Sequence, residues 1–413
     1  MAQVRPFRAM RPSKGFEEKV IAKPYDVMDR SEASKMAEGN KYSFLHVTRS
    51  EIDLPKEDNP YADSVYDKAG ENLKNLMRDG TYMIESKPML YIYRQQVKDH
   101  VQTGIVGCVS IDDYEADVIK KHEFTRYDKE KDRERHFIAC NADTEPVFIT
   151  YRDNSQIRTL VEGFMSNNAP VYDIADFDGV SHRVWAVNDD NVINGICGFF
   201  EKVDSLYIAD GHHRAASAYK VGQMMREKHP QYTGKEEFNF FPAVIYPDKD
   251  LKVLDHNRVV RDLNGNTINE FLDKIKNAGF EVSEPVEEGA KPVRAGEISM
   301  FLDNLWYTIR ITEGMIPEDL TESLDVSVLQ EKLLRPILGI KDIRNDERID
   351  FVGGAGGIQE LEIKTKNGMS VAFCMYPVTV AKVMEVSDAG LTMPPKSTWF
   401  EPKPASGLFI HLL

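Results

Sequence analysis

The sequence changes from a β-rich run to a helical pattern around a single glycine, Gly211. Residues 206–208 form a short apolar run typical of a buried strand, and residues 215–227 have the alanine-rich composition of a helix. Between them stands Asp210-Gly211-His212-His213-Arg214. A glycine adopts the backbone angles of a sharp turn without steric cost. The segment is therefore predicted to form a strand, a short polar turn and a helix.

The same alternation of strands and helices runs along most of the chain. Helical periods occupy residues 62–78, 155–165 and 192–202, and β-rich runs occupy residues 89–93, 103–111, 146–151 and 238–246. After Asn264 the composition shifts and a second set of elements follows. The sequence predicts an α+β (mixed α/β) protein. We expect residues 1–85 to pack on a core of residues 86–262, and residues 263–413 to form a C-terminal α+β region with a tail that returns to the active site.

Charge and composition exclude several classes of protein. The net charge of −15 argues against a nucleic-acid binder, because phosphate contacts need a basic surface. Apolar stretches are too short for a membrane span, and the N-terminus lacks the apolar core of a signal peptide. The four cysteines show no CxxC spacing, which is typical of free thiols in a reducing compartment. We expect a cytoplasmic protein that binds small molecules. Its oligomeric state stays open, and a homodimer is compatible with the sequence.

The segment from Asp210 to Arg214 is the first candidate for chemistry. The start of a helix presents free N–H groups and the positive end of the helix dipole, which together attract anions. Arg214 and His213 add donors in the first turn, and Asp210 stands at the end of the predicted strand, where α/β sheets place ligands. The alternative interpretation is that Asp210 only caps the helix and both histidines lie on the surface.

Two further segments carry candidate residues. In the charged run of residues 119–126, Glu123 suits a general base or a metal ligand, and His122 precedes it. The alternative is a solvated charge run. In the Pro-rich tail of residues 394–403, Lys396 stands beside Ser397 and Thr398, a combination that suits phosphate. The alternative there is an extended structural C-terminus.

The Asp210–Arg214 segment resembles the ParB/sulfiredoxin-like superfamily, in which a Gly-x-x-Arg turn at a helix start binds nucleotide phosphates. Its fuller form, Asp-Gly-His-His-Arg, is similar to the free serine kinases of that superfamily, and Lys121-His122-Glu123 is similar to their catalytic Glu segment. Over nearly its whole length the chain also resembles a bacterial family known only as a domain of unknown function. That second resemblance rests on residues 5–7, 24–27, 40–46, 121–125, 210–214 and 393–403.

The resemblance implies a ParB/sulfiredoxin-like nucleotide-binding core that phosphorylates L-serine to O-phosphoserine. Asp210 and Glu123 would then be the catalytic carboxylates and Mg²⁺ ligands, and the sequence does not separate their roles. Gly211, His212, His213 and Arg214 would bind the phosphates of ATP, ADP or pyrophosphate. The residues expected to bind substrate or phosphate are His122, Lys396, Ser397 and Thr398.

Two rival functions follow from the same resemblance. One is a nucleotide-sensing regulator without turnover. The other is a sulfiredoxin-like repair enzyme, which needs a cysteine in the phosphate turn. His212 and His213 stand where that thiol would be, so this rival ranks last.

Overall fold

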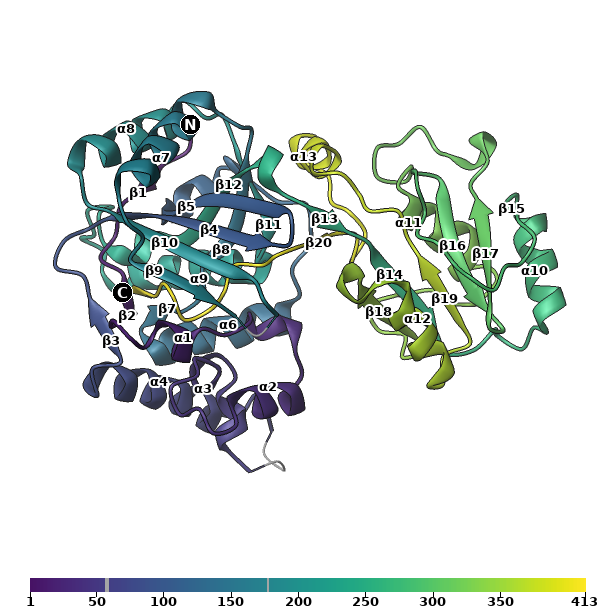
Figure 1. Ribbon diagram of the computed structural model, residues 1–413, viewed down its shortest axis with the longest axis horizontal. Coiled ribbons are helices and arrows are strands. Elements are labelled where there is room, and N and C mark those ends of the chain that lie inside the picture. The colour runs from purple at the N-terminus through teal and green to yellow at the C-terminus, as the bar shows by residue number, and fades with distance from the viewer. Residues whose placement is uncertain (56–58, 177) are drawn as a thin grey trace. The chain divides into compact units, whose positions relative to one another are not determined.

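The computed structural model describes residues 1–55, 59–176 and 178–413. These residues divide into two compact units, which we treat separately. The core unit comprises residues 1–121, 125–251 and 402–413, and the C-terminal unit comprises residues 122–124 and 252–401. Figure 1 shows the helices and strands of both units. The chain thus enters the core unit a final time at Pro402, after it has formed the C-terminal unit.

Within the described residues, the core unit is built on a nine-stranded mixed sheet. The strand order is β6-β11-β8-β12-β5-β4-β10-β9, with β1 beside β5. Strand β11 is parallel to β6, β12 is parallel to β8, and the other pairings are antiparallel. The core unit also contains two separate two-stranded sheets, β2-β3 and β7-β21. The strands are β1 Val4–Arg5, β2 Met10–Pro12, β3 Tyr82–Ile84, β4 Leu90–Val97, β5 His100–Ser110, β6 Ile119–Lys120, β7 Ala142–Asp143, β8 Val147–Tyr151, β9 Tyr172–Ala175, β10 Ser181–Val187, β11 Leu206–Asp210, β12 Phe240–Pro247 and β21 His411–Leu412.

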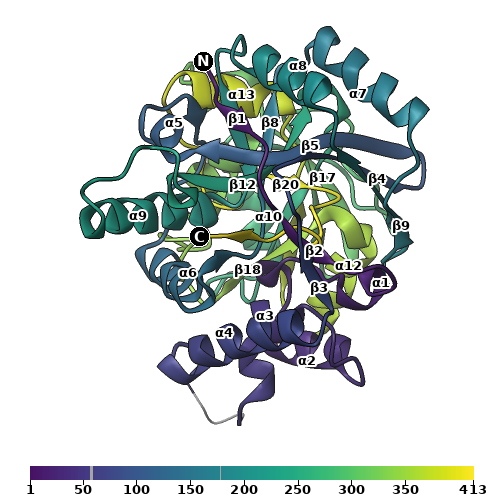
Figure 2. The same ribbon diagram turned by 90° about the vertical axis from the view of Figure 1, so that its left-hand side faces the viewer.

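The helices of the core unit pack on this sheet through apolar faces. One buried cluster joins residues of the strands to Ile157 of α7, Ile196 of α8 and Ala215 of α9. Helix α6 packs against both α4 and α9 (Figure 2). The helices are α1 Glu17–Val20, α2 Arg30–Ala37, α3 Leu45–Thr48, α4 Asp63–Arg78, α5 Ile111–Glu115, α6 Tyr127–Cys140, α7 Ser155–Asn167, α8 Asp190–Phe200 and α9 His212–Lys228, with 3₁₀ turns at Tyr25–Val27, Ser50–Asp53, Glu237–Asn239 and Asp248–Asp250.

The C-terminal unit has its own six-stranded antiparallel sheet, in the order β15-β17-β16-β19-β14-β18. One buried cluster includes Val259 of β14, Trp306 of β17 and Leu361 of α12. Strands β13 and β20 form a separate pair. The elements are β13 Val253–Leu254, β14 His256–Val260, α10 Ile268–Asn277, β15 Glu281–Val282, β16 Glu297–Leu302, β17 Leu305–Arg310, α11 Asp325–Leu329, β18 Ile349–Gly353, α12 Gly357–Lys366, β19 Val371–Cys374, α13 Val380–Asp388 and β20 Trp399–Phe400, with a π turn at Gln330–Leu334 and 3₁₀ turns at Glu313–Met315 and Gly354–Gly356.

The prediction of a mixed α+β protein is confirmed, with two local differences. The strand predicted at residues 206–208 continues to Asp210, and the helix predicted from residue 215 begins at His212. Gly211 alone makes the turn, because its φ of 93° lies in the left-handed region. Helix α6 buries two acids, since Glu130 and Glu134 are less than a tenth exposed. Among the described residues, none of the helices is long and apolar enough to cross a membrane.

Candidate functional site

The strand–glycine–helix segment places Asp210 and Arg214 side by side at one end of the core-unit sheet. The pairing register of β11 with β8 shifts between Ile208 and Asp210. Such an irregularity turns a strand and re-aims its side chains. Gly211 then reverses the chain, and a Cβ at this position would lie 2.8 Å from Nε of Arg214. Only glycine leaves room for the arginine to fold back over the turn.

Asp210 is held between two cations. Nζ of Lys403 donates to Oδ1 at 2.5 Å, and Nη2 of Arg214 donates to Oδ2 at 2.7 Å. The side chain of Asp210 is 22% exposed, whereas those of Lys403 and Arg214 are 10% and 6% exposed. Burial alone would raise the pKa of Asp210, but the charges of Lys403 and Arg214 outweigh it and hold that pKa well below its usual range. Asp210 is therefore a stable carboxylate.

Arg214 is fixed from behind while part of its guanidinium stays unsatisfied. Nη1 donates to the backbone carbonyl of Pro146 at 2.5 Å. Nε is buried and has no hydrogen-bond partner among the described residues. Burial would lower the pKa of Arg214, but the charges of Asp210 and Asp26 raise it. The guanidinium is thus a permanent cation with donor capacity to spare.

The first turn of α9 offers backbone N–H groups to an anion. Gly211 occupies the N-cap position, and no side chain of the described residues caps the helix there. The N–H groups that open a helix lack intrahelical partners and favour anions. The alternative in which Asp210 caps the helix does not fit this geometry, because its oxygens accept from Lys403 and Arg214 instead.

The two histidines of the segment differ in their surroundings. His212 is 5% exposed, so it is not a surface residue. Nε2 of His213 accepts from the backbone N–H of Arg126 at 3.0 Å, which leaves Nδ1 as the protonated nitrogen in the neutral ring. Burial lowers the pKa of His213, so the neutral form prevails at pH 7.

Behind Arg214 lies a small cluster of buried acids. A cavity of about 20 Å³, enough for one water, is lined by Arg133, Asp143, Glu145 and Arg214 among others. Burial raises the pKa of Asp143 to about 8, and Oδ2 of this residue has no partner among the described residues. Glu145 accepts from the backbone N–H of Tyr25 at 3.2 Å, and its pKa is also raised by burial. Asp143 and Glu145 therefore share this small cavity with Arg214.

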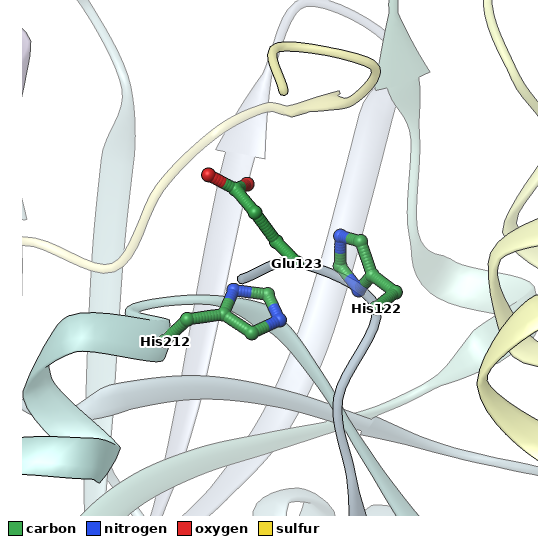
Figure 3. A group of neighbouring side chains, drawn as sticks. All are labelled: His122, Glu123 and His212. Atoms are coloured by element: carbon green, nitrogen blue, oxygen red, sulfur yellow. The ribbon is translucent and has the colours of Figure 1, made fainter. Parts of the chain in front are cut away.

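The segment with His122 and Glu123 follows β6 and is grouped with the C-terminal unit. The backbone N–H of Met393 donates to the carbonyl of His122 at 2.7 Å, and Nε2 of His122 lies 3.4 Å from Oγ1 of Thr398. Within this unit His122 therefore lies beside the tail that carries Lys396, Ser397 and Thr398, so two of the predicted candidate segments are in contact. Figure 3 shows the side chains of His122 and Glu123 in this loop, and that of His212 on α9.

Lys396 and Ser397 complete this part of the tail. Lys396 is exposed and has a φ of 60°, a left-handed conformation that is uncommon outside glycine. Ser397 is 6% exposed, and its hydroxyl donates to the carbonyl of Pro394 at 2.6 Å. The Ser397 hydroxyl hydrogen is thus engaged in shaping the turn, whereas its oxygen can still accept.

One family profile matches residues 4–327 of the chain; its description is protein of unknown function (DUF1015). The chain belongs to the DUF1015 family. This agrees with the resemblance drawn from the sequence to a family known only as a domain of unknown function. No curated protein matches the chain.

Several solved structures are similar to this DUF1015 protein at low identity. A free serine kinase in complex with AMP has 15% identity and a TM-score of 0.36, with 71% of this chain and 86% of that chain covered. A conserved hypothetical protein from Pyrococcus furiosus has 17% identity and a TM-score of 0.36, with 74% and 94% covered. SbnI with C-terminal truncation from Staphylococcus aureus has 11% identity and a TM-score of 0.40, with 74% and 87% covered. The ParB/sulfiredoxin-like assignment stays a prediction.

In this DUF1015 protein the core unit brings Asp210, Gly211 and Arg214 together with Lys403, which the sequence analysis did not single out. Lys403 lies 193 positions from Asp210, and local periodicity carries no information about such a pair. Asp26 was missed as well, although its charge acts on both Arg214 and Lys403. Both residues stand in segments that carried the family resemblance, residues 24–27 and 393–403, and this resemblance is the signal that points to them.

Proposed function

We propose that this protein is a kinase of free L-serine that transfers a phosphoryl group from ATP, ADP or pyrophosphate to the serine hydroxyl. The observation that supports a phosphate site best is the pair of cations, Lys403 and Arg214, on either side of Asp210 at the start of α9. Phosphoryl transfer depends mainly on positioning and charge neutralisation. The choice of serine rests on the resemblance of the Asp210–Arg214 motif to the free serine kinases.

The first turn of α9 is assigned to the phosphates of the donor. Backbone N–H groups of His212 and His213 would bind phosphate oxygens, and Arg214 would add a charge-assisted contact. Lys403 supplies the second positive charge. In the reaction the serine oxygen bonds to phosphorus as the bond from phosphorus to the leaving oxygen of the donor breaks. The proton of the hydroxyl passes to a carboxylate of the protein.

Glu123 is the better candidate for that base, and Asp210 is the better candidate for an organiser of charge. A general base works best when its pKa lies near the working pH. The pKa of Asp210 lies well below its usual range, so its affinity for a proton is low. Lys403 and Arg214, the two cations that lower this pKa, are in turn held in place by the carboxylate of Asp210. We therefore assign proton transfer to Glu123 and the positioning of Lys403 and Arg214 to Asp210.

Mg²⁺ fits Asp210 poorly in this arrangement. Both carboxylate oxygens of Asp210 already accept from cations, and a divalent ion there would face two positive charges. Glu123 is the remaining candidate ligand, since carboxylate oxygens suit this hard ion. Bound Mg²⁺ would neutralise charge on the donor phosphates. His122, Lys396, Ser397 and Thr398 are assigned to the serine or its phosphate, which is supported by the contact between His122 and Thr398.

The test is incubation of the purified chain with L-serine, Mg²⁺ and each donor in turn, with O-phosphoserine as the readout. Glu123→Gln should lower turnover by about 10²–10⁴, as expected for loss of a general base, and should leave donor binding measured without Mg²⁺ unchanged. Asp210→Asn should lower turnover without weakening phosphate binding, because both cations remain. Arg214→Ala should weaken donor binding as well. Glu227→Gln, at an exposed position near the end of the same helix, is the control.

The outcome of this assay separates the kinase from the regulator. A wild-type protein that binds nucleotide but yields no O-phosphoserine with any of the three donors contradicts the kinase proposal and favours a nucleotide-sensing regulator. Full activity in Glu123→Gln would contradict only the role of Glu123 as the base and would leave the kinase proposal standing.

A further inference from the structure

The C-terminal unit buries an arginine that has no acidic partner among the described residues. Arg258 of β14 is 2% exposed. Its Nη1 donates to the carbonyl of His256, and its Nη2 donates to the carbonyl of Lys396 at 3.1 Å. Its guanidinium carbon lies 5.5 Å from the ring centre of Phe351. Backbone carbonyls satisfy hydrogen bonds but leave the positive charge without a counter-ion.

Two other arginines with little exposure, Arg214 and Arg133, do face an acidic side chain. Arg214 is paired with Asp210, and Arg133 is paired with Asp132 at 2.8 Å. For Arg258 the described residues offer no such carboxylate. Asp255, the nearest acid along the strand, is engaged by Lys291 at 2.5 Å and by the amide of Asn257. Burial lowers the pKa of Arg258 to about 9, so the side chain is still positive at neutral pH.

A buried charge without a partner is strongly unfavourable, so the residues that surround Arg258 are of interest. His256 precedes it on the same face of β14, and Nδ1 of His256 lies 3.2 Å from the carbonyl of Thr398. The turn at residues 396–398 therefore covers both side chains. Its outer residue, Lys396, is exposed and adds a second positive charge.

We propose that Arg258, with Lys396 and Thr398 of the covering turn, binds the oxyanion of a small molecule. Guanidinium groups bind carboxylates and phosphates through paired hydrogen bonds, which supply charge and geometry together. Arg258 retains N–H groups beyond the two that contact carbonyls. A hydroxyl at Thr398 and an ammonium at Lys396 match the remaining oxygens of such a group. The ligand is a carboxylate or a phosphate, the chemistry that an amino acid and its phosphate ester share.

Lys396 and Thr398 are also assigned above to the serine or its phosphate, so in this respect the inference rests on the proposed function. Arg258 itself is distinct in sequence and in unit from the Asp210–Arg214 segment. A structural tether is the competing interpretation, in which Arg258 only holds the turn through the Lys396 carbonyl. The tether and the anion site predict different results. Removal of a tether lowers the free energy of unfolding in every buffer, whereas removal of an anion site lowers the stabilisation that added anions give.

The experiment measures binding of inorganic phosphate and of L-serine to the full chain by calorimetry and by thermal shift. Arg258→Met should weaken binding of at least one of them by about 10- to 100-fold, the usual value for loss of a charge-assisted contact. The arm that loses affinity identifies the oxyanion as phosphate or carboxylate. Arg258→Lys, which keeps the charge but loses the planar fork, should bind with intermediate affinity and covers the case in which Arg258→Met does not fold. Arg261→Gln, an exposed arginine just beyond the same strand, should bind like the wild type.

Arg214→Ala is measured in parallel to separate the two anion sites. Binding that Arg258→Met removes and Arg214→Ala retains supports the proposal even when no O-phosphoserine is formed. If wild type and both Arg258 variants bind phosphate and L-serine with equal affinity, the proposal is overturned and Arg258 is a tether. A wild type that binds neither compound overturns it as well.

Discussion

Removal of the Lys403 ammonium by Lys403→Met should destabilise the core unit mainly through Asp210. Nζ lies 2.5 Å from Oδ1, and at an effective dielectric constant near 20 the gross attraction of such a pair is about 7 kcal/mol. Most of this is offset by the loss of hydration of both groups. Asp210 is 22% exposed and keeps Arg214, so we expect a net loss of about 1–3 kcal/mol in the free energy of unfolding.

A double-mutant cycle with Asp210→Asn isolates the pair. The coupling free energy should be about 1–3 kcal/mol at pH 7, within the range found for contacting charges. Urea titrations followed by circular dichroism supply the four free energies. The pair Lys249 and Asp153, whose lysine side chain is 73% exposed, serves as a surface control and should couple by less than about 1 kcal/mol.

The pH dependence gives the sign of the effect. The pKa of Asp210 is depressed in the folded protein, so its stabilising contribution is present above the ordinary aspartate pKa and is lost as pH falls through the depressed value. Lys403→Met raises the folded pKa of Asp210 toward its ordinary value. The coupling should therefore be full at pH 7 and decline as pH falls through the raised pKa of the variant. A coupling near zero at pH 7, or one that grows toward acid, would refute this reasoning.

Two other substitutions test the surroundings of the turn. The pKa of Asp143 is raised to about 8 in the folded state, so between about pH 4 and pH 8 the folded protein binds a proton that the unfolded chain has lost. The free energy of unfolding should therefore fall with rising pH over this range, by up to about 1.4 kcal/mol per pH unit. Asp143→Asn should remove this slope in urea titrations, and an unchanged slope would contradict the reasoning. Gly211→Ala should cost about 1–2 kcal/mol and weaken phosphate binding, because φ is 93° and the new Cβ would displace Arg214. Gly234 has a φ of 86°, and a Cβ added there would meet no described atom within 4 Å. Gly234→Ala should therefore show the backbone cost without the loss of phosphate binding.

Local pattern was enough to predict the elements that carry the site, because each depends on neighbours in sequence. The strand before Gly211 and the helix after it follow from an apolar run, a glycine and an alanine-rich segment. The tail was expected to return to the active site, but local pattern does not tell that Lys403 is the residue that pairs with Asp210, since this depends on the path of the last segment in space. The missing counter-ion of Arg258 was equally hidden. A strand that reads His256 to Val260 looks ordinary until every charge around it is known.

The two buried arginines show how the same side chain serves different ends according to its counter-charge. Arg214 faces Asp210, an internal carboxylate that neutralises it and Lys403 in part while no ligand is bound. A phosphate at the turn therefore gains less than it would from bare cations, which favours release of a product. Among the described residues, Arg258 has backbone carbonyls as its hydrogen-bond acceptors and no carboxylate, so an arriving oxyanion would gain the full benefit of its charge. The turn before α9 is thus suited to exchange of phosphate groups, and the strand position at Arg258 to retention of a carboxylate or phosphate.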